Sequence, residues 1–202
     1  MKLYFAPGTC SHSPHIALRE AGLPFELVRV DLKTKQTADG RDYLAINPNG
    51  YVPALELDDG TILTEGPAIV QYIADQAPQS GLAPANGTLP RYQLQSLLGF
   101  INSEIHKGFS PLFKPDTPEA TKVAAKTHLA NRIGTIAQRL EGQDYLTGSQ
   151  FTVADGYLYT VLGWGQFVGV DVSRWPAITA FLERVGARAS VKAAREAEGL
   201  NR

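Results

Sequence analysis

The order of its hydrophobic patterns constrains the fold of this chain more than any other feature. Two short runs, KLYFA (residues 2–6) and FELVRVDL (25–32), have the apolar and alternating residues that are typical of β-strands, and residues 13–21 between them have helical spacing. A hairpin pattern, ALELDDGTIL, follows at residues 54–63, and a second helical pattern comes after it. Residues 1–77 are therefore predicted to form a small mixed sheet with helices on its faces, in the order β-α-β-α-β-β-α.

A change in composition marks the end of this region. Residues 78–90, PQSGLAPANGTLP, are rich in Pro, Gly and Ala and have no periodicity, which is typical of a linker. Beyond them only helical segments are predicted, at about 91–112, 118–141, 152–168 and 176–188. The chain is thus expected to be an α+β protein, with a mixed first domain and an all-α second domain at residues 91–202.

Composition narrows the class of protein. With 19 Lys and Arg against 20 Asp and Glu, the chain has no general field for nucleic acid or for an anionic membrane. It has no apolar run of about 20 residues, as a membrane-spanning helix needs, and its N-terminus turns too early for a secretory signal. A single Cys excludes an internal disulfide, and four scattered His give no metal-ligand spacing. We expect a reduced cytoplasmic protein without a metal site.

The one cysteine, Cys10, stands between the first strand and the first helix. Helix-start amides stabilise a thiolate, so this position is expected to lower the pKa of the thiol. Cys10 and Ser13 form a C-x-x-S pattern, which can make a mixed disulfide with an outside thiol but cannot close one internally. The alternative is a small buried residue that happens to be Cys. Both interpretations stay open on the pattern alone.

Two residue pairs surround the hairpin. Val52-Pro53 precedes its first strand, where proline marks either a strand start or a cis bond. A cis bond would turn the Val52 backbone outward, towards an extended peptide-like ligand, whereas an ordinary loop proline is the commoner case. Glu65-Gly66 begins the next helix, where free N–H groups suit a carboxylate and Glu65 suits an ammonium group. The simpler alternative is a glutamate that only favours the helix start.

The first helix of the second domain carries a polar stripe on an otherwise apolar surface. Its members are Gln95, Gly99, Asn102, Ser103 and His106. Helical spacing puts them on one face, which either meets solvent or lines a wet cleft.

Thr152-Val153-Ala154-Asp155 opens a later apolar helix with the pattern of a capping box. We expect Asp155 to determine the fold and not to take part in chemistry.

Taken in order, these elements resemble the bacterial beta-class glutathione S-transferases. The likeness rests on Cys10, Val52-Pro53, Glu65-Gly66, HKGFSPLF (106–113) and FTVAD (151–155), and it covers essentially the whole chain. LAINPNGYVPALELDDGTILTEGPAIVQYIAD, residues 44–75, is the most specific stretch. The resemblance implies a thioredoxin-like domain at 1–77, an all-α domain at 91–202 that forms the electrophile pocket and the dimer contacts, and a homodimer. It implies glutathione as co-substrate and no tightly bound cofactor.

The resemblance also implies roles for individual residues. Cys10 would face the glutathione sulfur, with His106 beside it as a second catalytic residue. Lys35 would approach the glycyl carboxylate. The remaining glutathione contacts would be the Val52 backbone with a cis Pro53, Glu65 and Gly66 at the γ-glutamyl end, and Ser103 and Glu104, with residues of their helix reaching the neighbouring subunit's site. The pocket for the second, apolar substrate would be formed by Lys107, Phe113 and Trp164.

The implied function is conjugation of glutathione to small apolar electrophiles, as in detoxification. Because a cysteine is a better nucleophile than a Ser or Tyr hydroxyl, thiol-disulfide exchange through a Cys10–glutathione mixed disulfide is expected as well. Reductive removal of halogen is a narrower enzymatic alternative that no residue selects. Another class is a non-catalytic module that binds glutathione, an apolar ligand or a partner. Gly99 favours it weakly, because relatives have Asn there and one lost hydrogen bond costs about 0.5–1.5 kcal/mol.

Overall fold

A computed structural model describes residues 1–200 of the chain, so the last two residues of the predicted second domain, 201 and 202, lie outside the described part. The chain divides into two compact units. Unit 1 contains Met1–Ala83 together with the segment that begins at Arg188, and unit 2 contains Pro84–Ala187. The boundary between Ala83 and Pro84 falls within the predicted linker at residues 78–90. The segment that begins at Arg188, which was expected in the second domain, groups with the sheet instead.

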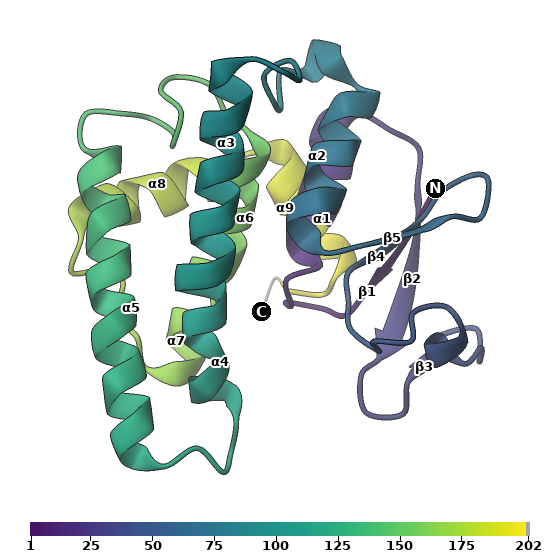
Figure 1. Cartoon of the computed structure of the whole chain (residues 1–202), viewed down its shortest axis with the longest axis horizontal. Coiled ribbons are helices and arrows are strands. Elements are labelled where there is room, and N and C mark those ends of the chain that lie inside the picture. The colour runs from purple at the N-terminus through teal and green to yellow at the C-terminus, as the bar shows by residue number, and fades with distance from the viewer. Residues whose placement is uncertain (201–202) are drawn as a thin grey trace. The chain divides into compact units, whose positions relative to one another are not determined.

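Unit 1 is built on a five-stranded mixed sheet (Figure 1). Its strands are β1 (Lys2–Phe5), β2 (Glu26–Asp31), β3 (Gln36–Thr37), β4 (Ala54–Glu56) and β5 (Ile62–Thr64), in the spatial order β3-β2-β1-β4-β5. β1 pairs in parallel with β2, and the other pairs are antiparallel. The hairpin β4–β5 has the predicted position, and its register pairs Leu55 with Leu63. The sheet places the end of β1 and the start of β4 side by side, since Tyr4 pairs with Ala54.

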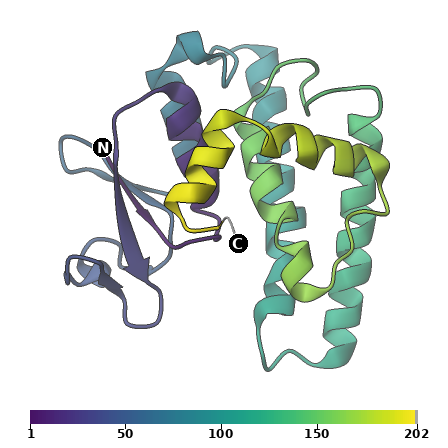
Figure 2. The same cartoon turned by 180° about the vertical axis from the view of Figure 1, so that it is seen from behind.

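Three α-helices belong to unit 1: α1 (His12–Ala21), α2 (Gly66–Gln76) and α9 (Ala189–Ala197). α1 ends at Gly22, whose φ of 66° gives a left-handed C-cap. α9 was not predicted as part of this unit, yet it packs against α1 and buries Val191 and Ala194 (Figure 2). The second helix of the predicted pattern is only a 3-10 turn, η1 (Tyr43–Ala45), and another such turn, η2 (Pro78–Ser80), lies in the predicted linker.

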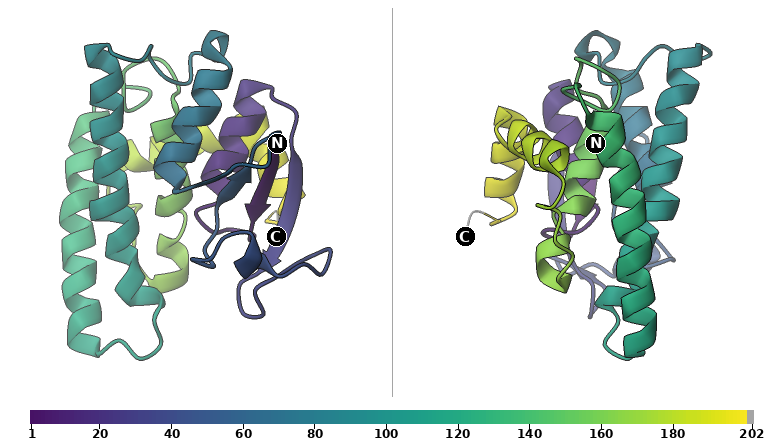
Figure 3. Two further views of the ribbon diagram at one scale, coloured as in Figure 1. Left: turned by 45° about the vertical axis from the view of Figure 1, so that its right-hand side comes forward. Right: turned by 90° about the vertical axis from the view of Figure 1, so that its left-hand side faces the viewer.

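Unit 2 is helical throughout (Figure 3). It contains α3 (Leu89–Phe100), η3 (Ile101–His106), α4 (Lys107–Phe113), α5 (Glu119–Leu140), α6 (Val153–Leu162), α7 (Gly165–Val168) and α8 (Pro176–Gly186). α6 is buried along almost its whole length and packs against α3, η3 and α8. Within residues 1–200, no helix combines the length and the hydropathy that crossing a membrane requires.

The predicted helix 91–112 is interrupted by a π-helix, η3. The N–H of Lys107 bonds to the carbonyl oxygen of Asn102, five residues back, instead of the usual four. π-helical turns are rare and often occur at functional sites. The spacing rule that put the polar stripe on one face therefore does not hold across residues 101–106.

Candidate functional site

Cys10 lies in the loop between β1 and α1, one residue before the N-cap Ser11. The Ser11 hydroxyl is buried and bonds to both backbone groups of Ala6, accepting from its N–H at 3.2 Å and donating to its carbonyl oxygen at 3.1 Å. These bonds fix the loop. The Cys10 thiol donates in turn to the carbonyl oxygen of Val52 at 3.2 Å. The sulfur therefore has a defined position at the helix start, as the sequence predicted.

The expected lowering of the Cys10 pKa is wrong. Burial raises the pKa of this thiol to about 11, and the negative charge of Glu65 acts in the same direction. The backbone N–H groups of Cys10 and Ser11 do lower it, as expected of helix-start amides, but desolvation is the larger effect. At neutral pH Cys10 is a thiol that can donate a hydrogen bond.

The Val52-Pro53 bond is cis, which confirms that prediction. The preceding carbonyl, that of Tyr51, accepts hydrogen bonds from the Tyr43 hydroxyl at 2.7 Å and from Asn47 Nδ2 at 2.8 Å. Within residues 1–200 the N–H of Val52 has no hydrogen-bond acceptor. A rigid stretch of backbone thus presents one unused donor.

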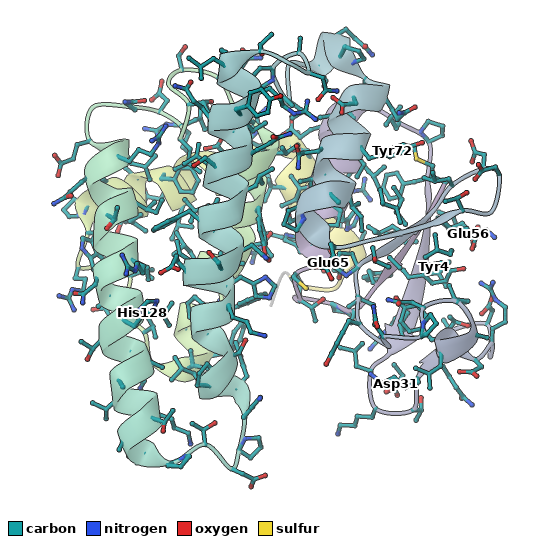
Figure 4. All side chains as sticks on the ribbon, viewed as in Figure 1. Tyr4, Asp31, Glu56, Glu65, Tyr72 and His128 are labelled. Carbon is teal, nitrogen blue, oxygen red and sulfur yellow. The ribbon has the colours of Figure 1, made fainter. Side chains whose placement is uncertain are left out.

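Glu65 lies at the start of α2 with an exposed side chain, and Figure 4 labels it there. It is the helix N-cap, and its φ of 66° is unusual for a residue with a side chain. The carbonyl oxygen of Glu65 accepts the N–H groups of Ala68 and Ile69, both at 3.0 Å. The Gly66 N–H has no acceptor among the described residues.

The two pairs of residues around the hairpin are neighbours in space. A Cβ added to Gly66 would lie 3.9 Å from Cγ of Pro53, so the start of α2 contacts the cis proline. Because Cys10 bonds to Val52 and the charge of Glu65 acts on Cys10, all three elements meet at one edge of unit 1.

Lys35 is hydrogen-bonded to the loop that precedes Val52. Its Nζ donates to the carbonyl oxygen of Gly50 at 2.8 Å, two residues before Val52. Its backbone has a φ of 57°, in the left-handed region that few side chains adopt. The structure thus brings a cation, a free amide, a thiol and an exposed carboxylate together within unit 1.

In unit 2, His106 lies in an aromatic cluster. Its Nδ1 is 2.6 Å from the Tyr157 hydroxyl, which also bonds to Oδ1 of Asn102 at 2.9 Å. The Trp164 ring stands edge-on to the imidazole, 4.8 Å between centroids, and to Phe113, 5.9 Å between centroids. Burial, followed by the charge of Lys107, lowers the pKa of His106 to about 4, so the imidazole is neutral at pH 7. Trp164 is buried and Phe113 half exposed.

The other predicted residues of this helix point to different partners. Ser103 donates to the carbonyl oxygen of Gly99 at 3.0 Å. Glu104 pairs with α5, through Arg132 at 2.9 Å and His128 at 3.5 Å, and Figure 4 labels His128 there. Lys107 is exposed. Ser103 and Lys107 are therefore accessible, whereas Glu104 is already ion-paired within unit 2.

Asp155 caps α6, as the sequence predicted. Its carboxylate accepts three hydrogen bonds at 2.8 Å, from the N–H of Leu146 and from the N–H and hydroxyl of Thr152. Burial raises its pKa to about 6 against the effect of these donors. The side chain is fully buried in the helix start and serves the fold.

The sequence did not predict a cluster formed by His12, His15 and Glu198. Glu198, which follows α9, accepts from Nδ1 of His12 at 2.7 Å, from Nδ1 of His15 at 2.8 Å and from the N–H of Gly8 at 3.0 Å. Two of the four scattered His therefore converge, and the three side chains are close enough to hold a metal ion. Each of the three ligand groups is engaged in these hydrogen bonds, and Arg19 donates to Nε2 of His15 at 2.8 Å. The cluster ties α9 to the loop that leads to Cys10.

Comparison with known proteins gives a consistent result. Two family models match, the glutathione S-transferase N-terminal domain over residues 8–76 and the glutathione S-transferase C-terminal domain over residues 100–189. Glutathione S-transferase GstA of Escherichia coli O157:H7 is 46% identical over 200 residues, which cover 99% of this chain and 100% of that protein.

Solved structures agree with this match over the same length. BphK, a bacterial glutathione S-transferase solved as a ternary complex, is 60% identical with a TM-score of 0.97, covering 99% of this chain and 100% of its own. The beta-class enzyme of Sphingomonas chungbukensis is 50% identical with a TM-score of 0.95, and it has the same coverage. A sphingomonad glutathione S-transferase complexed with glutathione is 52% identical with a TM-score of 0.96, again with this coverage. By its sequence and by the folds of both units, this chain belongs to the bacterial beta-class glutathione S-transferases and is a glutathione transferase.

Proposed function

We propose that unit 1 binds glutathione in an extended conformation along the edge that carries Lys35, Val52 and Glu65. The ligand has a carboxylate at its glycyl end, peptide groups and a thiol in the middle, and an ammonium with a second carboxylate at its γ-glutamyl end. The ammonium group of Lys35 complements the glycyl carboxylate, and the carboxylate of Glu65 complements the ammonium of the γ-glutamyl end. The free N–H of Gly66, at the start of α2, suits the second carboxylate.

The unused N–H of Val52 is the observation on which this proposal rests. A backbone donor without a partner costs free energy when it is desolvated, so a ligand that covers it must supply an acceptor. The carbonyl of an extended tripeptide supplies one. The Cys10 thiol is hydrogen-bonded to the carbonyl oxygen of Val52. A tripeptide that pairs with the Val52 N–H would therefore have its own thiol close to Cys10.

We propose conjugation to apolar electrophiles as the main activity, with Cys10 as a neutral hydrogen-bond donor. The reactive form of glutathione is its thiolate. When glutathione binds, the single S–H of Cys10 would turn from the Val52 carbonyl oxygen to this thiolate and stabilise the anion. The raised pKa of Cys10, about 11, keeps this donor protonated at neutral pH. Trp164 and Phe113 offer apolar surface to the second substrate, with Lys107 and His106 as their polar neighbours. Holding both substrates in one orientation accelerates their reaction.

Thiol-disulfide exchange through Cys10 is proposed as a minor activity. The thiolate is the attacking species, and with a pKa of about 11 only on the order of one Cys10 in ten thousand is ionised at pH 7. Binding of glutathione, which displaces solvent near the sulfur, would change the ionised fraction of Cys10. Exchange is thus expected to grow with pH while conjugation stays dominant near neutrality.

We further propose that the chain acts as a homodimer through α3 and α5. These helices border a groove of about 360 Å³ that includes Leu97, Phe100 and Ile136, and nearby Leu89 and Tyr92 are largely exposed. A second copy would cover this apolar surface. Sedimentation velocity distinguishes the dimer from a monomer.

Variants at Cys10 test the proposal. Cys10→Ala removes the donor and is expected to lower kcat/KM for conjugation roughly 10- to 100-fold, the effect of one hydrogen bond to a charged group. Cys10→Ser keeps a donor and should retain most of the conjugation, while both variants lose disulfide exchange. Conjugation that survives in Cys10→Ala while exchange disappears would show that the cysteine is mainly a redox group.

Binding is tested separately on immobilised glutathione. Lys35→Met and Glu65→Gln should each weaken retention, whereas Lys33→Met, which removes an exposed charge two residues from Lys35, should not. Equal retention of all three variants and the unmodified protein would contradict the proposed path.

A further inference from the structure

The two ring nitrogens of His106 differ in their surroundings. Nδ1 belongs to a chain of hydrogen bonds with Tyr157 and Asn102, and Nε2 does not. Nδ1 lies 2.6 Å from the Tyr157 hydroxyl. Among residues 1–200, Nε2 has no hydrogen-bond partner. In a neutral imidazole one nitrogen carries the proton and the other accepts, so the partner of Nδ1 decides what Nε2 can do.

The direction of the Tyr157 hydroxyl settles that choice. It donates its one proton to Oδ1 of Asn102 at 2.9 Å, and a carbonyl oxygen can only accept. Since that proton is used, the hydroxyl oxygen must accept from His106, and Nδ1 must carry the imidazole proton. Nε2 then keeps its lone pair.

We infer that Asn102 acts through Tyr157 as a positioning residue that holds His106 in the Nδ1–H tautomer, with Nε2 as a hydrogen-bond acceptor. The ring orientation is fixed as well, because the imidazole stands edge-on to both Tyr157, at 5.8 Å, and Trp164, at 4.8 Å between centroids. All the groups belong to η3, α6 and the residues that follow α6, and both hydrogen bonds are partly buried.

Both side chains that reach Tyr157 come from the π-helix η3. Asn102 and His106 are four residues apart at its two ends, and both reach the same hydroxyl on α6. Tyr157 is buried in the centre of unit 2, so its oxygen is a fixed reference point for both side chains. Two side chains of this π-helix therefore converge on one oxygen.

For the proposed function, this tautomer assigns a specific task to His106. The acceptor Nε2 can orient a donor of the substrates, such as the glutathione S–H before ionisation, or a water molecule. It does not store the proton, because burial and Lys107 hold the pKa of His106 at about 4, far below that of a free thiol, about 8.5. This step rests on the proposal that His106 acts at bound glutathione, whereas the tautomer itself does not.

Nitrogen-15 NMR of the imidazole at neutral pH tests the tautomer directly. The unmodified protein should show a protonated Nδ1 and an unprotonated Nε2 for His106. Asn102→Ala removes the acceptor of the Tyr157 hydroxyl, which then turns to donate to Nδ1, so the proton should move to Nε2. Asn102→Asp keeps an acceptor oxygen and should keep the original tautomer. A protonated Nε2 in the unmodified protein, or no change in Asn102→Ala, would overturn the inference.

Kinetics separate this inference from the proposed function. Asn102→Ala and Tyr157→Phe are expected to lower kcat/KM for conjugation about 2- to 10-fold, the effect of one misplaced hydrogen bond. Tyr159→Phe, which removes a half-buried hydroxyl from the same helix, is the matched control and should leave the tautomer unchanged. If His106→Ala retains full activity while the tautomer shifts as expected, the role of His106 in the proposed function fails and the inference stands. If Asn102→Ala loses activity with the tautomer unchanged, the inference fails.

Discussion

The thiol of Cys10 donates a hydrogen bond to the carbonyl oxygen of Val52, 3.2 Å away within unit 1. A thiolate cannot donate, so ionisation would remove this bond and leave a negative sulfur beside a carbonyl dipole. The bond therefore acts in the same direction as burial, which raises the pKa of Cys10 to about 11. Burial and this bond together keep Cys10 in its thiol form near neutrality.

Alkylation of Cys10 should be slow near neutrality and strongly dependent on pH. We expect its rate with iodoacetamide to rise about tenfold per pH unit between about pH 7 and about pH 10, because the thiolate is the reactive form. Mass spectrometry of the intact protein measures the rate. The protein unfolded in urea is the control, since its thiol has an ordinary pKa of about 8.5 and the rate should level off above that pH. A plateau near pH 7 in the folded protein would contradict the raised pKa.

Loss of the Glu198 carboxylate should destabilise unit 1. Glu198→Ala leaves His12, His15 and the Gly8 N–H without their shared acceptor, and breaking a buried pair of this kind costs about 3–5 kcal/mol. Urea unfolding followed by circular dichroism gives the free energy of unfolding. Glu196→Ala removes an exposed carboxylate from the end of α9 and should change it little. Equal losses in the two variants would show that the cluster has no particular effect.

The same cluster predicts acid sensitivity. Burial raises the pKa of Glu198, but the hydrogen bonds from His12 and His15 outweigh it and lower this pKa to about 2 from an ordinary 4.5. The contribution of Glu198 to stability is therefore present above pH 4.5 and is lost as the pH falls towards 2. Burial lowers the pKa of His15, so below its ordinary 6.5 the unfolded chain takes up a proton that the folded chain refuses. Both effects reduce stability on acidification. In Glu198→Ala the decrease below pH 4.5 should be smaller.

Asp155 should stabilise unit 2 without affecting chemistry. Asp155→Ala leaves the N–H groups of Leu146 and Thr152 buried without acceptors, at a cost of about 1–3 kcal/mol for each group. Thermal unfolding should show a large decrease in Tm. Asp155→Asn keeps one acceptor oxygen, so its Tm should lie between that of the unmodified protein and that of Asp155→Ala. If both variants have the same Tm as the unmodified protein, the capping contacts make no measurable contribution to stability.

Gly99 should accept a side chain without strain. A Cβ built there meets no atom within 4 Å, and the residue is exposed in α3. Gly99→Ala should raise the free energy of unfolding by about 0.5–1 kcal/mol, because glycine is unfavourable inside a helix. Gly99→Asn supplies the amide that the family resemblance implies at this position and should lower KM for glutathione several-fold, with Gly99→Ala as the control for helix stability. An unchanged KM in Gly99→Asn would show that this contact is absent.

The sequence predicted correctly those strands, turns and helix caps that depend on residues close together in the chain. The period-two run at residues 26–31, the Asp-Gly hairpin and the capping box of Asp155 occur where the sequence placed them, because each depends on neighbours in the chain. The position of Cys10 belongs to the same class, whereas the cis bond at Pro53 was implied only by the family resemblance.

Features that depend on distant parts of the chain were not predicted. Glu198 is 183 residues from His15 in sequence, and a carboxylate near the end of a short helix carries no signal of its buried partners. The π-helix has no periodic signature over six residues. The direction of the Cys10 pKa depends on how much protein surrounds the sulfur, which helix-start amides alone do not reveal.

The position of Glu198 has a consequence for how the protein is made. Ribosomes synthesise chains from the N-terminus, so the strands β1 to β5 and the Cys10 loop emerge long before α9. At roughly 5–20 residues per second, the loop waits about 10–40 s for the carboxylate that accepts its Gly8 N–H. During that interval the nascent sheet lacks one of its helices, and chaperones that bind exposed apolar surface have their best opportunity to act on it.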